Sequence, residues 1–464
     1  MAARFVNIDH DTPLLLPPDL RDWVPENHMV HLVMDAVSQL DLSVARVNER
    51  GTGDAQYPPG MMLGLLLYSY ATGVFSSRAI ERSTYENVAV RLLCADTHPD
   101  HDTICAFRRA NDPLLRASFA QVLELAARCG VLKVGGITVA IDGTKVLANA
   151  SKHSAISYQR AREQMRELDL EIEQLLRKAE EADATPLEDG LSIPDEVQRR
   201  QQRQALLKKA CAEMEVRAGA KAQAERPEYE AKMAAREEKK ADGKKPRGQE
   251  PKAPSATPEP KDQYNFTDPE SRIMKAGSGS HFEQCYNAQA AVEVDSRLIA
   301  GQRVDHAPND KEQLVPTLAA VAPEAGPVRE VLIDSGFVSE AAVRAVEADA
   351  QGRPTGVRVL AAVKREKHGR TVEQLEKKDD PPAPAADAPF PERMAHRVAT
   401  QAGRTRYKLR QQTVEPIFGI IKEAMGFRRF SLRGEAQVSL EWTLVTLAYN
   451  LKRLFHLGVE VQTA

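Results

Sequence analysis

The stretch "VAIDGTK" (residues 139–145) decides the fold of this chain, together with its near-copy "VLIDSGF" (residues 331–337). Each is an apolar run that reaches Ile-Asp and is followed by small residues that include a glycine. The β-branched residues favour strands. A buried carboxylate is costly unless a partner compensates its charge. We therefore expect Asp142 and Asp334 at the ends of two neighbouring strands, at the sheet edge where α/β folds keep their sites.

We expect the first of these strands at the centre of a sheet that is covered on both faces. Residues 135–146, "GGITVAIDGTKV", carry no charge at the alternate positions before Asp142, which indicates burial on both faces. Downstream, apolar and polar periodicity predicts a hairpin that turns at Asp295-Ser296, followed by alternating helices and strands. The expected ranges are strands 285–295 and 297–305, helix 310–321, strand 329–336, helix 339–349, strand 356–364 and helices from 392 onward. This order predicts a mixed α/β sheet.

Composition narrows the class of protein. The 464 residues suffice for about two to four domains, and 42% are hydrophobic. Lys plus Arg number 63 and Asp plus Glu 66, a net charge of -3, so the chain is not uniformly basic, although charge can be segregated locally. An odd number of cysteines, five, and no CxxC pair favour a reducing cytoplasm. The first residues lack a signal-peptide pattern, and the apolar stretch 61–75 is too short to span a bilayer, so we expect a soluble cytoplasmic protein without a membrane partner.

Residues 15–134 are predicted to be helical. "PPGMMLGLLLYSYATG" starts with prolines and stops at Gly73, as a core helix does. The segment "DTICAFRRAN" predicts a helix capped by Asp102. Short helices with projecting arginines are compatible with a helix-turn-helix, but a plain helical bundle is the simpler interpretation. Arg78, Arg82 and Arg108 are candidate DNA contacts.

Residues 156–240 form a long helical insertion. Apolar residues recur at spacings of three and four with charged flanks, which is a heptad seam. The seam residues are Tyr158, Ala161, Met165, Leu168, Ile172, Leu175, Ala179 and Ala182. "TPLEDGLSIPD" breaks the seam, and a return helix follows at Leu207, Cys211, Met214 and Ala218. An antiparallel hairpin is the economical interpretation, and dimerisation through the seam is the alternative. Residues 237–263 and 375–391 are charged or proline-rich, which predicts a flexible linker and a disordered loop.

Two adjacent aspartates at one sheet edge need a cation between them, because like charges that close repel each other. Mg²⁺ binds oxygen ligands and few protein carboxylates, and a pair of such ions about 4 Å apart is the usual device for in-line phosphoryl transfer. Glu415 in "YKLRQQTVEPIFGIIKEAMGFRRF" is the best candidate for a third acid. We expect it near the start of a helix, where Pro416 is tolerated.

The surroundings of Glu415 are basic. Between Arg404 and Arg433 there are eight Lys or Arg and two Glu, so the stretch carries a net charge of +6. Lys422 lies two helical turns after Glu415 on the same face, and Arg410 lies within reach of that face. Binding of a phosphate backbone at a cutting site requires this combination of an acid and cations.

Each of these features has a structural alternative. Asp142 and Asp334 could cap turns, Glu415 could be an acid favoured by a helix dipole, and Lys422 could be a solvated lysine. A zinc site at Cys94, His98, His101 and Cys105 fits no standard spacing, and a loop with a capped helix is favoured there. Trp442 and Tyr449 could stack on bases, but the leucines around them favour core packing.

Together these motifs resemble those of the DDE transposases of bacterial insertion sequences, in the group with a Tyr-Arg-Glu-Lys signature. "IDGTKVLANASKH" is similar to the first Asp segment of that family, "YNAQAAVEVD" to its second strand, "IDSGFVS" to its second Asp segment and "VEPIFGIIK" to its third-acid helix. "PPGMMLGLLLYSYATGVFSSRAIE" also resembles the N-terminal helical part of such proteins. Four motifs in the family's order make this resemblance specific, and it covers most of the chain.

The resemblance implies an α/β fold with a ribonuclease H-like mixed sheet, an all-α N-terminal domain and a long helical-hairpin insertion after the first catalytic strand. The expected divisions are 1–134 for the DNA-binding domain, 135–150 with 281–464 for the catalytic domain, and 151–280 for the insertion. It also implies Asp142, Asp334 and Glu415 as ligands of two Mg²⁺ ions, for which Mn²⁺ could substitute. Tyr407, Arg410 and Lys422 would grip the DNA end, with Arg428 and Arg429 in the same basic stretch. Four residues separate Arg410 from Glu415 where the family has three, which puts the Tyr407 and Arg410 assignments in doubt.

The function expected from these residues is cleavage of transposon ends and their joining to target DNA. The DNA partners would be double-stranded terminal inverted repeats and target DNA, bound by a homodimer or larger assembly near the bacterial nucleoid. A nuclease of the same fold without strand transfer, and a DNA-binding protein without catalysis, remain as alternatives.

Overall fold

A computed structural model describes residues 19–48, 55–133, 135–182, 192–241, 249–275, 281–363, 379–385 and 387–461. The chain divides into two compact units. One unit consists of Met1–Leu147 together with Tyr286–Ala464, and the other consists of Ala148–Cys285. Three regions named above lie wholly or partly outside the described residues. They are the first residues of the chain, where no signal peptide was expected, the break of the heptad seam, and the two predicted loops 237–263 and 375–391.

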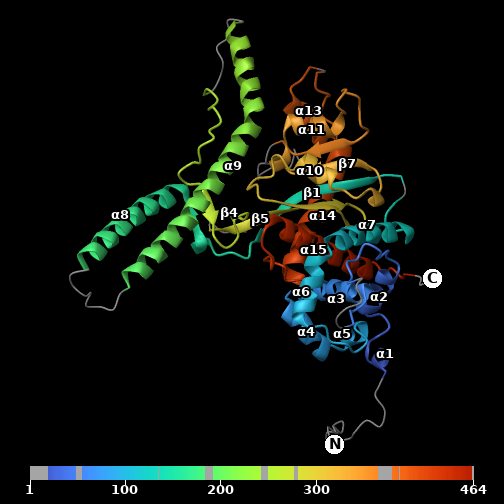
Figure 1. The fold of residues 1–464 in the computed structure, drawn as a ribbon. Helices are drawn as coiled ribbons and strands as arrows, with labels where there is room; N and C mark the ends of the chain where they lie inside the picture. The colour runs from blue at the N-terminus through green and yellow to red at the C-terminus, as the bar shows by residue number, and fades with distance from the viewer. Residues whose placement is uncertain are drawn as a thin grey trace, which may run out of the picture. The chain divides into compact units, whose positions relative to one another are not determined.

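The structure contains a six-stranded mixed sheet, of which all strands except β4 and the first residues of β5 belong to the larger unit (Figure 1). The strand order is β4-β5-β1-β7-β8, and β6 pairs with β5. Strands β1, β7 and β8 are parallel, whereas β5 is antiparallel to β4 and β6. The strands are β1 Ile137–Leu147, β4 Arg272–Lys275, β5 Phe282–Glu293, β6 Ile299–Asp305, β7 Val328–Ile333 and β8 Arg358–Ala361. The prediction of a mixed α/β sheet is confirmed.

The helices of the N-terminal region lie in the same compact unit as strands β1 and β7, and the division at residue 134 stays a prediction. They are α1 Leu20–Trp23, α2 Met29–Ser38, α3 Pro59–Ala71, α4 Ser77–Glu86, α5 Val88–Leu93, α6 His101–Ala110 and α7 Asp112–Arg128. Helix α3 is buried along most of its length and contacts the C-terminal helix α15, Glu435–His456. Helix α3 is apolar on nearly all sides, so it has to bury its surface against neighbours such as α15, most of which is also buried.

One helix start differs from the prediction. Helix α6 begins at His101, and its N-cap is Asp100, whose carboxylate accepts the backbone N–H of Thr103 at 2.7 Å. Asp102, the predicted cap, lies in the first turn of the helix. Two acids stood close together in the sequence, and the one that reaches the N3 amide is the cap.

The remaining helices of the larger unit are α10 Leu314–Ala319, α11 Glu340–Glu347, α13 Phe390–Ala399 and α14 Gln401–Gly419, followed by a π-helical turn at Ile420–Ala424. Helix α10 is shorter than the predicted 310–321, and α13 begins inside the predicted loop 375–391. No helix of the described residues is both long enough and apolar enough to cross a membrane.

A buried hydrogen-bond relay connects the N-terminal helices to α15. Arg108 donates to the hydroxyl of Tyr70 at 2.7 Å and to the carbonyl of Phe75 at 3.2 Å. Tyr70 in turn contacts Glu441, which is fully buried and accepts the backbone N–H of Ser431 at 2.8 Å. Burial raises the pKa of Glu441, and these donors together with Arg108 oppose the shift. Arg108 was predicted to contact DNA, and that prediction is wrong because the side chain is buried in this relay.

The smaller unit is the helical hairpin that the sequence predicted. Helix α8 runs from Tyr158 to Ala182 and α9 from Ile193 to Ala241 (Figure 1). The pairing Tyr158–Glu215, Asp169–Gln204 and Glu171–Arg200 shows that the helices are antiparallel. A two-stranded sheet of β2 Ala155–Ser157 and β3 Gln263–Asn265 closes the base, and a shared buried cluster joins it to both helices. The hairpin therefore packs the first part of its seam against the return helix, with Tyr158 and Ala161 buried and Met165 and Leu168 partly buried, which agrees with the simpler of the two interpretations.

Candidate active site

The parallel pairing of β1 and β7 brings the two aspartates together. Ile141 pairs with Ile333, so Asp142 and Asp334 follow paired residues on adjacent strands. Strand β1 continues through Asp142 to Leu147, so the prediction that the strand ends at this residue is wrong. Pairing with the segment after the π-turn extends it, because Phe430 donates its backbone N–H to the carbonyl of Leu147 at 2.9 Å.

Each aspartate uses one carboxylate oxygen locally and presents the other to the site. The Oδ1 of Asp142 accepts the backbone N–H of Gly143 at 2.8 Å. The Oδ1 of Asp334 accepts the N–H and the hydroxyl of Ser335, which begins a 3₁₀ turn. One carboxylate oxygen of Asp142 and one of Asp334 therefore cap a turn, as the structural alternative for these two residues proposed. This leaves both Oδ2 atoms free to face helix α14.

Arg410 of α14 lies between the three acids. Its Nη2 is 3.7 Å from Oδ2 of Asp142 and 3.4 Å from Oδ2 of Asp334. Its Nη1 is 3.5 Å from Oε1 of Glu415. The side chain of Arg410 is only 7% exposed, whereas that of Glu415 is 60% exposed. The structure therefore gathers all three acids that the sequence singled out around one buried guanidinium.

The two aspartates differ in their electrostatic environment. Burial raises the pKa of Asp142 to about 6, despite the opposing effect of Arg410. Burial also acts on Asp334, but Arg410 and the N–H of Ser335 outweigh it and leave the pKa of that carboxyl below its ordinary value. Neighbouring acids whose pKa values are pushed apart are typical of functional sites.

Helix α14 is held against this strand pair at three successive levels. Arg406 donates to Glu330 at 2.7 Å and to the hydroxyl of Thr138 at 2.6 Å. One residue further, the hydroxyl of Tyr407 donates to the carbonyl of Ile333 at 3.1 Å. Arg410 follows at the level of the aspartates. These contacts fix the height at which Glu415 reaches the site.

The position of Glu415 in its helix differs from the prediction. Helix α14 starts at Gln401, so Glu415 lies in its second half, and Pro416 lies inside the helix. Proline removes a helical hydrogen bond and disturbs the turn around it. The chain then passes into the π-turn, which carries Lys422. Turns of this kind are frequent at functional sites.

Lys422 contacts the strand that carries Asp142. Its Nζ donates to the hydroxyl of Thr144 at 2.5 Å and to the carbonyl of Lys145 at 2.9 Å. Arg428 and Arg429, further along the basic stretch, have exposed side chains, and Arg428 pairs with Glu423. On α4, Arg78 and Arg82 are exposed. Of the cations predicted to bind DNA, Arg410 lies at the acids and Lys422 contacts strand β1. Arg78, Arg82, Arg428 and Arg429 are exposed, whereas Arg108 is buried.

The structure contains a polar cluster beside Asp142 that was not predicted from the sequence. Asp310 accepts the amide groups of Asn287 at 2.7 Å and Gln289 at 2.8 Å, and Lys145 lies 3.7 Å from it. A Cβ on Gly143 would lie 2.8 Å from Oδ1 of Asp310, closer than real Cβ contacts. The signal in the sequence was the pair of polar residues in "YNAQAAV", two positions apart in an apolar strand, because two such residues share one face.

The donor set of the site is suited to a divalent cation, because three carboxylates supply the oxygen ligands that Mg²⁺ prefers. The buried Asp142 also needs a positive partner, which Arg410 provides. Within the described part of the chain, however, no three His, Cys, Asp or Glu side chains lie close enough to hold one ion. Asp142, Asp334 and Glu415 are the residues that would hold such an ion, and in the present arrangement Arg410 lies between them.

The suggested zinc residues have other partners. The ring of His98 stacks on Tyr85 with centroids 3.9 Å apart, and His101 pairs with Glu81 at 2.8 Å. Burial raises the pKa of Cys94 to about 12, so its thiol stays protonated. The favoured interpretation, a loop and a capped helix, is confirmed. Trp442 and Tyr449 are likewise buried, as core packing required.

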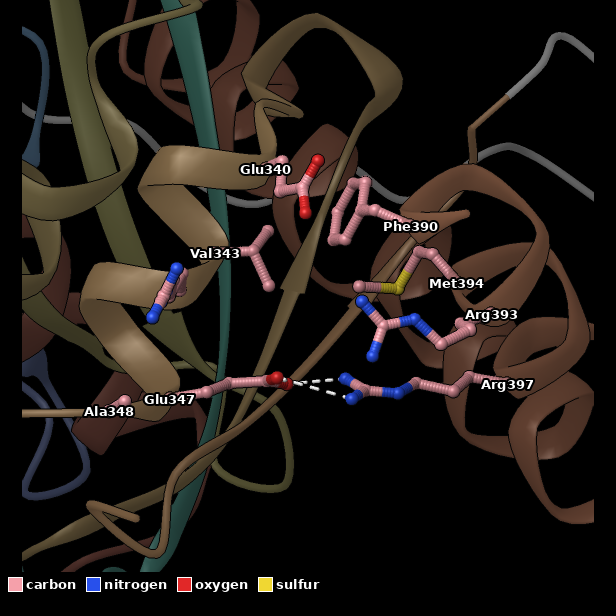
Figure 2. Close-up of a pocket in the computed structure, with 9 residues that line it drawn as sticks. Glu340, Val343, Glu347, Ala348, Phe390, Arg393, Met394 and Arg397 are labelled. Atoms are coloured by element: carbon pink, nitrogen blue, oxygen red, sulfur yellow. Dashed lines mark hydrogen bonds and ion pairs between the residues drawn. The ribbon is translucent and has the colours of Figure 1, made fainter. Parts of the chain in front are cut away.

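A hollow of about 320 Å³ lies away from the acids, between α11 and α13 (Figure 2). In it Arg397 donates to both oxygens of Glu347, which also accepts the backbone N–H of Val359 at 2.9 Å. Phe390 and Met394 line the same hollow. The ion pair of Arg397 with Glu347, together with the contact of Glu347 to Val359, joins α13 to strand β8 at this hollow.

Acids on two adjacent parallel strands of an α/β sheet, with a third acid on a helix against them, are the arrangement expected of a DDE-type site. Comparison with family models supports the same class at both ends of the chain. Residues 18–110 match the family described as "Transposase domain (DUF772)", and residues 386–455 match the "Transposase DDE domain". Both matches are to transposase families, and together they support a DDE transposase of an insertion sequence.

The matched segments cover less than half of the chain. Glu415, Tyr407, Arg410 and Lys422 lie within the second segment, whereas Asp142 and Asp334 lie outside both. The roles of the aspartates therefore depend on the strand geometry described above. No curated protein and no solved structure matches the chain.

Proposed function

We propose that this chain cuts the ends of its own mobile element and joins them to target DNA by metal-dependent phosphoryl transfer. The observation that supports this proposal is the convergence of Asp142, Asp334 and Glu415 on one guanidinium. The three acids come from segments far apart in the sequence. Structural caps would not need to share one cation.

In this proposal Asp142, Asp334 and Glu415 hold two Mg²⁺ ions, with Mn²⁺ as a possible substitute. When bound, the ions supply Lewis acidity at the attacking and leaving oxygens of the phosphodiester. The two aspartates are placed on rigid strands, and the exposed Glu415 completes the set from a helix interrupted by Pro416. The separation of pKa values favours Asp334 as a carboxylate that is charged at all working pH values.

The neighbouring cations would bind the DNA end. Arg410 neutralises the acids in the present arrangement and, when these hold a cation, offers its guanidinium to phosphate oxygens. Lys422 contacts Thr144 of strand β1, two residues after Asp142, and would bind the DNA end there. Tyr407 fixes α14 on Ile333 and so sets the height of Arg410. Arg428 and Arg429 extend the cationic surface along the backbone.

The exposed Arg78 and Arg82 of α4 are the candidates in the N-terminal region for recognition of terminal inverted repeats. Two element ends have to be brought together before they are joined. We therefore expect a dimer or larger assembly on DNA, and assignment to the Tyr-Arg-Glu-Lys group belongs to the same proposal.

The test is cleavage of a supercoiled plasmid that carries the inverted repeats flanking the reading frame. We expect wild type to cut and join DNA with Mg²⁺ or Mn²⁺ and to be inactive in EDTA. Asp142→Asn should retain DNA binding and lose at least about a hundredfold in cleavage rate, since about 3 kcal/mol of charge stabilisation is removed.

Other outcomes would select another class. Cutting without joining would identify a nuclease of the same fold. If wild type and Asp142→Asn both bind DNA and neither cuts it under any metal condition, the catalytic proposal is wrong and a DNA-binding protein remains.

A further inference from the structure

The insertion unit contains a hollow of about 650 Å³ that the catalytic site does not use. The first turns of α8, the middle of α9 and the β2–β3 sheet surround it. Three cations reach it: Arg160 from α8, and Arg203 and Lys209 from α9. Its polar and aromatic lining includes Gln164, Tyr264 and Phe266.

The charges of this hollow are not balanced. Among the residues that the structure describes, no aspartate or glutamate lines it. Arg160, Arg203 and Lys209 are exposed, and in the described ranges none of the three forms an ion pair. The neighbouring Arg200 behaves differently, since it pairs with Glu171 at 2.7 Å and with Glu196 at 2.6 Å.

An aromatic pair holds the central cation in place. The guanidinium of Arg203 lies over the ring of Phe266, 4.9 Å from its centroid. Phe266 packs edge-on against Tyr264, with centroids 5.5 Å apart, and Tyr264 belongs to the buried cluster of the hairpin. A cation–π contact stabilises the position of a guanidinium while leaving its charge and its N–H donors available. Arg203 is therefore oriented for an anion in advance.

The spacing of the cations indicates a chain of phosphates. Arg203 and Lys209 are six residues apart on one helix, about 9 Å along its axis. One DNA strand advances about 3.4 Å of helix axis per phosphate, so this distance spans roughly two to three phosphates. Lysines and arginines are balanced by acids over the insertion as a whole, whereas the described lining of the hollow contains cations and no acid.

We propose that the hollow between α8, α9 and the β2–β3 sheet binds the phosphodiester backbone of double-stranded DNA, through Arg160, Arg203 and Lys209, outside the cleavage site. This inference rests on the proposed function for the identity of its ligand as DNA. Backbone contacts of this kind position a duplex without reading its sequence. The insertion would thus provide a second DNA-binding surface, in addition to the proposed cleavage site in the larger unit.

The test compares full-length protein with the triple variant Arg160→Ala, Arg203→Ala, Lys209→Ala. Binding of a labelled duplex of mixed sequence is measured by fluorescence anisotropy over a series of KCl concentrations. Each lost phosphate contact removes about 0.9 from the slope of log K against log salt, so we expect the slope to fall by about 2 to 3. The matched control is Arg200→Ala, on the same helix and outside the hollow, and it should leave the slope unchanged.

The readout requires no cleavage, so it is independent of the proposed catalysis. An inactive wild type whose slope still falls in the triple variant supports the DNA site and rejects the transposase chemistry. An unchanged slope in the triple variant, in protein whose cleavage depends on Asp142, rejects the DNA site alone. A change in oligomeric state with an unchanged slope would assign the hollow to a second copy, and competition by inorganic phosphate at matched ionic strength would assign it to a single anion; either result overturns the proposal.

A second measurement does not depend on the triple variant. Leu206 lines the hollow and is half exposed, so a photo-crosslinking benzoylphenylalanine there should attach to bound duplex on irradiation. The control position is Leu170 on α8, which is exposed and outside the lining. Equal crosslinking at both positions, or none at Leu206, contradicts the inference.

Discussion

Arginines are used in opposite ways at two places in this protein, among the polar partners of the larger unit and around the hollow of the insertion unit. In the catalytic unit Arg108, Arg406 and Arg410 each contact polar or acidic partners, and Arg410 alone contacts three carboxylates. In the insertion unit Arg160 and Arg203 face a hollow without a carboxylate in its lining. The first group of arginines stabilises the protein, whereas the second leaves charge available to a ligand.

This difference shows that local charge in a sequence does not distinguish structural cations from binding cations. The stretch from Arg404 to Arg433 carries a net charge of +6, yet the side chain of Arg410 within it is buried and contacts three acids. The insertion is balanced overall, yet it holds the cations without acidic partners. The pairing of each side chain, rather than the charge of its neighbourhood, predicts what its removal will do.

The largest expected effect is at Arg108. Arg108→Ala removes the cation from a buried relay and leaves Tyr70 and the buried Glu441 without it. Breaking a buried charged network of this kind costs about 3 to 5 kcal/mol. We expect a decrease of that size in the free energy of unfolding, measured by urea titration with circular dichroism.

The control for this variant is Arg78→Ala, on the exposed face of α4. A surface substitution without such partners should change the free energy of unfolding by less than about 0.5 kcal/mol. Similar losses in both variants would show that the relay does not contribute to stability and would remove the distinction between buried and exposed arginines.

The second largest effect on the free energy of unfolding concerns Asp142, whose negative charge Arg410 does not fully compensate. The pKa of Asp142 is about 6 in the folded protein, above its ordinary value of 3.8, because of burial. The folded state therefore binds this proton more tightly, and stability should decrease as pH rises from about 4 to about 6. A shift of about two units corresponds to roughly 3 kcal/mol at most.

The measurement is urea unfolding of wild type and Asp142→Asn in EDTA at pH values below and above this window. Asparagine carries no charge, so the variant should be more stable than wild type above pH 6, and the difference should disappear near pH 4. Arg410, Asp334 and Asp310 also act on this carboxyl, and they are present in both proteins. A difference that does not vary with pH would mean that Asp142 is compensated in the folded state.

Much of the fold followed from sequence because its determinants are local. The alternation of β-branched residues in "ITVAIDG" and "VLIDSG" predicted both strands, and their parallel register placed Asp142 beside Asp334. The heptad seam predicted the α8–α9 hairpin for the same reason. The three acids could be named because each interrupts or precedes an apolar run.

What sequence did not predict depends on contacts between distant segments. The burial of Arg108 requires Glu441 from the last helix, and the place of Glu415 depends on where α14 begins. The cluster of Asn287, Gln289 and Asp310 arises only when strand β5 meets the loop before α10. Periodicity describes one element at a time, so it carries no information about such partners.

The smallest effect separates two arginines that lie one helical turn apart in the insertion. Arg200→Gln removes ion pairs with Glu171 and Glu196, which are partly exposed, so we expect a loss of about 0.5 kcal/mol in the free energy of unfolding, reduced further at high salt. Arg203→Gln removes no ion pair with an acid, and its stability should stay within about 0.5 kcal/mol of wild type at every salt concentration. Parallel urea titrations at low and high KCl measure both variants. A salt-dependent loss in Arg203→Gln as large as that in Arg200→Gln would show that Arg203 has an acidic partner within the protein, and the contrast between structural and binding arginines would fail at its sharpest point.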